Sequence, residues 1–128
     1  MHMTEYLIDA FAWVEYLEGS RQGEKVKKIL ENNACSTSAV TLAEVVSKAK
    51  RSGNDPQTAF DAVAANSKIL SVDAEIAKNA GLLHAEKKAR DKSFGLADAF
   101  ILAHRDKKQW ILTGDPHFRG IEKVEFLK

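Results

Sequence analysis

The chain has 128 residues, of which 45 % are apolar and 29 % are charged, and its formal net charge is +1. This length and composition predict one folded domain around a single core and exclude general disorder. The small net charge excludes a global attraction to nucleic acid or anionic lipid, so any such attraction has to come from local basic clusters.

In the first half of the chain, strand patterns alternate with helix patterns. The segment EYLI is short and apolar, and apolar residues at helical spacing follow it. The predicted elements are a strand over 5–8, a helix ending at Gly19, a helix over 22–31, a weak strand from Ala34, a helix over 42–51 stopped by Gly53, and a helix opened by Asp55 and Pro56.

The second half continues the alternation. Its predicted elements are a strand over 68–72, the longest helix from about Asp73 to near Ser93, a helix from Leu96 to about Arg105, a strand WILT, a turn GDPHF and a final strand VEFL. Parallel strands need long crossover connections, so this order predicts an α/β fold with three layers, in which helices cover both faces of a central parallel sheet.

The sequence also favours a cytoplasmic protein without a membrane partner. Cys35 is the only cysteine, so it cannot form an internal disulfide. No apolar run is long enough to cross a bilayer, and the N-terminal residues lack the apolar core of a signal peptide. A reducing cytosol is the simplest location.

Four acidic residues fall at or near the carboxyl ends of predicted strands, the edge where open α/β sheets bind ligands. Asp9 follows YLI, Glu44 lies early in the third helix, Asp98 lies early in LADAFILA, and Asp115 follows WILTG. Ile101 and Leu102 share the helix face of Asp98, so this carboxylate points toward the apolar side.

Each acidic residue also has a purely structural interpretation. Asp9 and Asp115 could be helix N-caps, and Asp98 could favour the positive end of its helix. The stretch from Thr41 to Glu44 has the spacing of a capping box. Taken singly, capping is the favoured interpretation of Asp9, Glu44 and Asp115.

Taken together, the four carboxylates favour a metal site. Each close pair would repel by roughly 4 kcal/mol at an effective dielectric constant near 20, and no Lys or Arg is adjacent in sequence to Asp9, Glu44 or Asp98. Ligation by oxygen alone suits hard divalent cations such as Mg²⁺ or Mn²⁺. Such an ion would activate water and neutralise a phosphate oxygen, as in metal-dependent nucleases.

Four stretches carry a resemblance to a known family. The segments LIDAFAWVEYLEGS, STSAVTLAEVVSKAKRSG, GLADAFILAHR and ILTGDPHFRGIEKVEFL resemble, in order and spacing, the successive motifs of PIN domains, particularly toxins of the VapC type. The likeness covers nearly the whole chain. It implies a parallel sheet of four or five strands between helices and an endoribonuclease that depends on Mg²⁺ or Mn²⁺.

The resemblance also implies roles for individual residues. Asp9 and Asp98 correspond to direct metal ligands, and Glu44 and Asp115 to ligands that bind directly or through water. Thr113 stands at the threonine position of the motif and would orient the cluster by hydrogen bonding. Ala10 departs from the pattern, since many members carry Thr or Ser there, and the chain therefore lacks one hydroxyl that could orient ligands or water.

RNA would need basic residues around an acidic pocket to hold its phosphates. We expect Lys92 and Arg119 to make such contacts, because they are nearest in sequence to the acidic motifs. His117, in the last motif, could contact a phosphate, but an exposed loop histidine is the favoured interpretation. His104 lies six positions after Asp98, on a different helix face, and is given no role.

The family resemblance further implies a homodimer and an antitoxin protein that wraps a groove beside the active site, with an Arg pushed into the acidic pocket. The main alternative is a catalytically weak PIN domain that binds RNA or protein. A nucleotide-binding α/β domain ranks last, because the chain has no glycine-rich phosphate loop.

Overall fold

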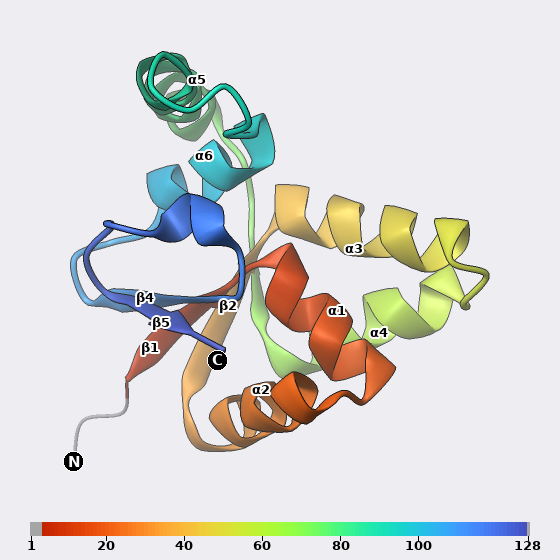
Figure 1. Ribbon diagram of the computed structural model, residues 1–128. Helices are drawn as coiled ribbons and strands as arrows, with labels where there is room; N and C mark the ends of the chain where they lie inside the picture. Colours follow the sequence, from red (N-terminus) through yellow and green to blue (C-terminus); the bar gives the residue numbers. More distant parts are fainter. Residues whose placement is uncertain (1–3, 128) are drawn as a thin grey trace.

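Figure 1 shows the computed structural model, which describes residues 4–127. The strands are β1 (Glu5–Ile8), β2 (Ala34–Ser38), β3 (Lys68–Leu70), β4 (Gln109–Thr113) and β5 (Val124–Phe126). The helices are α1 (Ala10–Glu18), α2 (Arg21–Asn32), α3 (Ala39–Arg51), α4 (Pro56–Asn66), α5 (Ala74–Lys88) and α6 (Leu96–His104), with a 3₁₀ turn, η1 (Pro116–Phe118).

The five strands form one parallel sheet in the order β3-β2-β1-β4-β5. β1 lies at the centre, between β2 and β4. The predicted three-layer α/β/α fold with a parallel sheet is confirmed, with five strands. In a parallel sheet all carboxyl ends meet at one edge, so the segments that follow β1 and β4 lie side by side.

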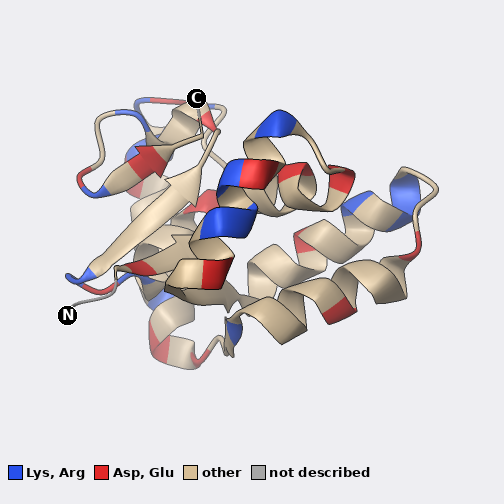
Figure 2. Ribbon diagram, turned by 90° about the horizontal axis from the view of Figure 1, so that it is seen from below, with Lys and Arg blue, Asp and Glu red and all other residues tan. Residues whose placement is uncertain are grey.

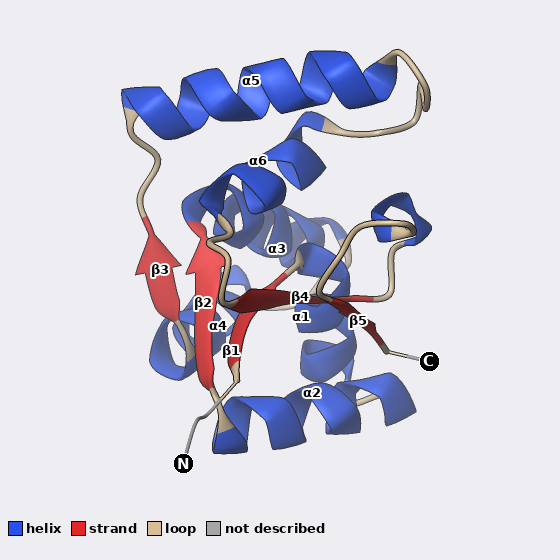
Figure 3. Ribbon diagram, turned by 90° about the vertical axis from the view of Figure 1, so that its left-hand side faces the viewer, coloured by secondary structure: helices blue, strands red, loops and turns tan. Residues whose placement is uncertain are grey.

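Alternating side chains of the central strands build a core on each face of the sheet. Ile8 and its partner Leu112 pack with Trp13 and with buried residues of α1 to α4. Leu7 and its partner Ile111 face the other way, toward α6 and η1. α5 packs on α6 and forms the outermost part of that layer (Figure 3).

Two helices differ from the sequence prediction at one end. α3 begins at Ala39 rather than Leu42, because the Ser38 hydroxyl accepts a hydrogen bond from the Val40 N–H at 3.1 Å and caps the helix. α5 ends at Lys88, five residues early, where the N–H groups of Arg90 and Asp91 both bond to the Lys87 carbonyl. The third strand is also shorter and ends at Leu70.

The core takes up most of the apolar residues of α1 and α2. Trp13 is fully buried, and its Nε1–H donates to the Thr37 hydroxyl at 3.0 Å. Phe11 and Leu17 stay 40 % and 36 % exposed, so α1 keeps a partly uncovered apolar face. Within residues 4–127, no helix has both the length and the apolar character needed to cross a membrane.

The approach of α2 to α1 leads to a prediction about Gly23. A Cβ added at this position would lie 2.1 Å from the carbonyl oxygen of Glu15, a backbone atom that cannot rotate away. We expect Gly23→Ala to lower the free energy of unfolding by about 2 kcal/mol or more, because the two helices must separate. Urea unfolding followed by circular dichroism measures the change.

Gly81, in α5, is the matched control, because an added Cβ there would meet no atom within 4 Å. Gly81→Ala should leave stability unchanged or raise it by about 0.5–1 kcal/mol through helix propensity. Equal effects of the two substitutions would contradict the close packing of α1 and α2.

Candidate metal centre

The four predicted acidic residues come from the carboxyl ends of β1 and β4 and from the first halves of α3 and α6. Asp9 directly follows β1 and caps α1, while Asp115 follows β4 by two residues and caps η1. Asp98 is the third residue of α6, and Glu44 is the sixth residue of α3. The fold therefore carries them from four separate segments to the same edge of the sheet.

Thr113 connects two of these residues. The Asp9 side chain is buried; its Oδ1 accepts the Ala12 N–H at 2.8 Å, and its Oδ2 accepts the Thr113 hydroxyl. The Thr113 Oγ1 in turn accepts the Asp115 N–H at 2.9 Å. One threonine thus hydrogen-bonds both to the Asp9 carboxylate and to the backbone that carries Asp115.

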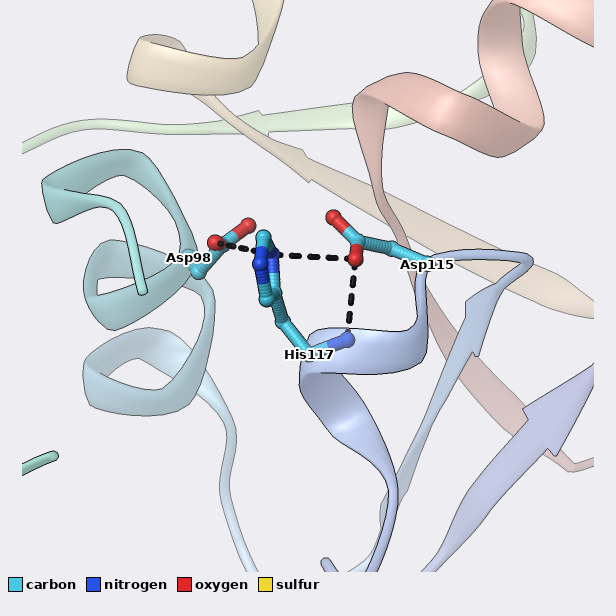
Figure 4. Close-up of side chains that lie close together, drawn as sticks. All are labelled: Asp98, Asp115 and His117. Carbon is cyan, nitrogen blue, oxygen red and sulfur yellow. Dashed lines mark hydrogen bonds and ion pairs between the residues drawn. The ribbon is translucent and has the colours of Figure 1, made fainter. Parts of the chain in front are cut away.

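His117 lies between Asp98 and Asp115 (Figure 4). Its Nδ1 is 3.3 Å from Asp98 Oδ2 and 3.0 Å from Asp115 Oδ1, and its backbone N–H donates to the same Asp115 oxygen at 2.9 Å. The expectation of an exposed loop histidine is therefore wrong. The mutual packing of α6 and η1, which local sequence does not reveal, brings the imidazole into the acidic cluster.

The carboxylates destabilise one another's charged forms. Burial raises the pKa of Asp9 to about 7, and the charges of Asp115 and Asp98 add to this shift. Burial and Asp115 also raise the pKa of Asp98, against a lowering hydrogen bond from the Gly95 N–H. Glu44 is exposed at the surface, but partial desolvation of its carboxyl group still raises its pKa. The negative charges of Asp98 and Asp115 add to this shift.

The donor set fits a divalent cation. Ligand atoms of Asp98, Asp115 and His117 all lie within 4.8 Å of one another. Over residues 4–127, no lysine or arginine makes an ion pair with any of the four carboxylates. Carboxylate oxygens suit Mg²⁺ and Mn²⁺, and the imidazole adds a nitrogen donor to the predicted oxygen-only set.

Helix capping is confirmed for two of the acidic residues and is wrong for a third. Asp9 caps α1 with Oδ1 while its Oδ2 accepts from Thr113, and the Oδ1 of Asp115 both caps η1 and faces the His117 ring. The capping box at Thr41 is wrong, because Thr41 lies buried inside α3 and its hydroxyl has no partner among the described residues. Glu44 therefore has no capping role at the start of α3.

Basic residues lie near the cluster on the side of η1. A pocket of about 240 Å³ is lined by nine residues, including Lys87, Arg90 and Arg119 and also His117. Lys92 is exposed in the turn between α5 and α6 and does not line this pocket. The same pocket is also lined by Glu86 and Asp91, and Figure 2 shows Lys and Arg on several other segments of the chain as well.

Comparison with known proteins identifies the family. The family model of the PIN domain matches residues 6–124. The chain belongs to the PIN domain family. No curated protein sequence matches it.

Solved structures share this PIN fold. A chain of a toxin–antitoxin complex from Klebsiella pneumoniae is 24 % identical, with a TM-score of 0.75 over 96 % of this chain and 98 % of that one. VapBC2 from Rickettsia felis, bound to a DNA fragment from its promoter, is 21 % identical, with a TM-score of 0.70 over 96 % and 98 %.

A third structure is VapC20 from Mycobacterium tuberculosis, described as a toxin that cleaves the sarcin–ricin loop. It is 20 % identical, with a TM-score of 0.58 over 77 % of this chain and 78 % of that one. At these identities the likeness establishes the fold of this PIN domain, and its activity has to be argued from the site.

Proposed function

We propose that this PIN domain is an endoribonuclease that depends on Mg²⁺ or Mn²⁺ and acts as the toxin of a toxin–antitoxin pair. The observation that carries the proposal is that Asp98 and Asp115 lie in one compact group, that their charges act on Asp9 and Glu44, and that none of the four makes an ion pair with a lysine or arginine within residues 4–127. Burial is the main cause of the raised pKa values of Asp9, Glu44 and Asp98, and repulsion between the carboxylates adds to it, as is common at functional sites.

In this proposal Asp9 and Asp98 hold the ion directly, and Glu44 and Asp115 hold it directly or through water. A bound divalent ion supplies a more acidic water and neutralises charge on a phosphate oxygen. Thr113 keeps Asp9 and the Asp115 backbone in place through its two hydrogen bonds. Glu44, on the exposed side of the cluster, can accept a proton from an attacking water.

Cleavage assays test the proposal. The purified protein is incubated with structured and with single-stranded RNAs, in Mg²⁺ or Mn²⁺ and in EDTA. We expect internal cleavage that requires the ion, and cleavage that persists in EDTA would contradict the metal mechanism.

RNA phosphates are proposed to contact the basic rim beside η1. Arg119 and Lys92 are the expected contacts, and the pocket shared by Arg119, Arg90 and Lys87 supports the position of Arg119. This rim would hold the phosphates that flank the cleaved bond, while the acidic cluster receives the scissile one.

Arg119→Ala should weaken RNA binding about three- to tenfold at 0.1 M salt and lower the salt slope by about 0.7–1, because one phosphate contact is lost. Binding is measured by fluorescence anisotropy on an Asp98→Asn background, so that the RNA stays intact. Lys108→Ala, in the exposed turn before β4, is the control and should change neither quantity. Equal RNA affinities of Asp98→Asn alone and of the two double variants would show that Arg119 does not contact RNA.

An antitoxin segment is proposed to occupy the groove between α1 and α3. This groove, about 730 Å³ in volume, is lined by apolar residues such as Phe11, Val14 and Val40 and by charged residues that include Glu44. A partner helix with an apolar face would cover the exposed Phe11, and an Arg at its end could pair with the carboxylates.

The proposal also includes a homodimer of this chain. Analytical ultracentrifugation of the purified protein measures its oligomeric state.

One observation favours the second candidate, a PIN domain that binds RNA or protein with little catalysis. α1 begins with Ala10, directly after Asp9, so no side-chain hydroxyl is available at that position to orient a water or a ligand. Absence of cleavage of any RNA in Mg²⁺ or Mn²⁺, together with retained RNA binding, would favour this candidate.

A further inference from the structure

The imidazole ring of His117 is held on both sides. Its Nε2 is 2.9 Å from the Ser93 hydroxyl, while its Nδ1 faces the oxygens of Asp98 and Asp115. The edge of the ring packs against Phe94, with 6.2 Å between ring centroids and planes at 70°. This ring is therefore fixed in one orientation, with one nitrogen directed at the acidic cluster.

The hydrogen bonds of Ser93 determine which ring nitrogen carries the proton. The Ser93 hydroxyl is 2.6 Å from Asp91 Oδ1, and the Ser93 N–H donates to the same oxygen at 3.0 Å. These bonds lower the pKa of Asp91, so its carboxylate is ionised and can only accept. The single hydroxyl proton of Ser93 goes to Asp91, and the Ser93 oxygen must then accept from His117 Nε2–H.

In a neutral His117, the proton on Nε2 leaves a lone pair on Nδ1. That lone pair points at two carboxylate oxygens, and Nδ1 is a buried atom without a hydrogen-bond partner among residues 4–127. Three electron-rich atoms facing one another are unfavourable unless a metal ion binds among them or a second proton on Nδ1 makes the ring an imidazolium. The separations of 3.0 and 3.3 Å are close to the roughly 3 Å between adjacent ligands of an octahedral ion with bonds of about 2.1 Å.

We propose that His117 Nδ1 is a ligand of the divalent ion, together with Asp98 and Asp115, and that the pair Asp91 and Ser93 positions the ring for this role. Metal-bound histidines commonly donate their other N–H to a partner that fixes the tautomer, and here that partner is the Ser93 hydroxyl. This inference rests on the proposed function, because it needs an ion in the acidic cluster.

The nitrogen ligand has a consequence for metal choice. Mg²⁺ prefers oxygen donors, whereas transition ions accept imidazole more readily. The chain should therefore prefer Mn²⁺ to Mg²⁺, and the preference should depend on His117. A merely structural histidine would affect both ions equally.

Pulsed electron paramagnetic resonance of bound Mn²⁺ tests the ligand directly, because a coordinated imidazole adds ¹⁴N modulation to the signal. The full chain is loaded with Mn²⁺ and compared with His117→Gln, and with His84→Gln on α5 as the matched control, since His84 makes no ion pair in the described structure. We expect ¹⁴N modulation in the wild type and in His84→Gln and its loss in His117→Gln.

Calorimetric titration gives the second readout. His117→Gln should weaken Mn²⁺ binding about 10- to 100-fold and Mg²⁺ binding by clearly less, and Ser93→Ala should weaken Mn²⁺ binding about tenfold by freeing the ring. Circular dichroism checks that each variant folds. Ser93→Ala keeps the His117 imidazole and removes only the hydroxyl that positions it. It therefore tests the positioning of the ring even if His117→Gln lowers stability.

The outcomes separate this inference from the proposed function. Mn²⁺ that binds the wild type without ¹⁴N modulation, or that binds His117→Gln equally well, would overturn the ligand role of His117 and leave the metal site in place. That result would indicate that His117 contacts the carboxylates as an imidazolium instead. A wild type that binds no Mn²⁺ would overturn both.

Discussion

Asp98→Asn is expected to reduce RNA cleavage in Mg²⁺ or Mn²⁺ about 10³-fold, equivalent to about 4 kcal/mol of transition-state stabilisation. The substitution keeps the shape of the side chain and an oxygen that can accept the Gly95 N–H, but it removes the negative charge that would hold the ion. The rate is measured with a labelled RNA at saturating metal.

Asp61→Asn is the control for this prediction, because Asp61 is exposed on α4 and bonds to Gln57 rather than to the cluster. Its rate should equal that of the wild type. Loss of charge at Asp98 relieves repulsion from Asp115, so Asp98→Asn should fold at least as stably as the wild type. A rate within a few-fold of wild type would contradict the role of Asp98.

The second large effect is on stability against pH in the absence of metal. Asp9 has a pKa of about 7 in the folded chain and an ordinary value of 3.8, so between these pH values the folded state binds more protons than the unfolded state. The free energy of unfolding therefore falls as the pH rises from about 4 to above 7, by up to roughly 4 kcal/mol from this residue. The raised pKa values of Asp98 and Glu44 act in the same direction.

Asp9→Asn should remove most of this dependence. Urea unfolding in EDTA at pH 5 and pH 8 is compared between the variant and the wild type, and the variant should lose less stability between the two pH values. Asp61→Asn should follow the wild type. If the free energies of unfolding of the wild type and Asp9→Asn differ by the same amount at pH 5 and pH 8, Asp9 is not desolvated as described.

Most of the fold follows from local sequence signals. The apolar runs at β1 and β4 are short and flanked by helix patterns, and a parallel sheet is the arrangement that allows these connections. The errors lie at helix ends, where a single hydrogen bond decides the boundary. Ser38 competes with Thr41 as the cap of α3 and prevails, because it directly precedes the first helical residue and leaves Thr41 inside the helix.

The capping interpretation and the site interpretation of Asp9 and Asp115 are compatible. Asp9 caps α1 with one oxygen and presents the other to Thr113, and Asp115 caps η1 while it contacts His117. A cap after a parallel strand necessarily lies at the ligand-binding edge of the sheet. At such positions one carboxylate can therefore cap a helix and belong to a site.

The contacts of His117 with Asp98 and Asp115 could not be predicted from the sequence. Its neighbours in the chain indicate only a turn, and its contacts with Asp98 and Ser93 join positions that are 19 and 24 residues away. The sequence held one local indication. His117 lies two residues after Asp115, and a capping carboxylate at that spacing accepts the N–H of the second residue after it, here His117. Its side chain could be placed only once α6 and η1 were packed together.

The central claim is that the four carboxylates tolerate one another because a divalent ion binds among them. A crystal of the protein soaked in Mn²⁺ and measured at the manganese absorption edge tests it most directly. The account predicts one anomalous peak within bonding distance of Asp9 and Asp98, with Glu44 and Asp115 in contact directly or through water. A cluster without a peak, or one filled by a lysine or arginine side chain of the same chain, would contradict it.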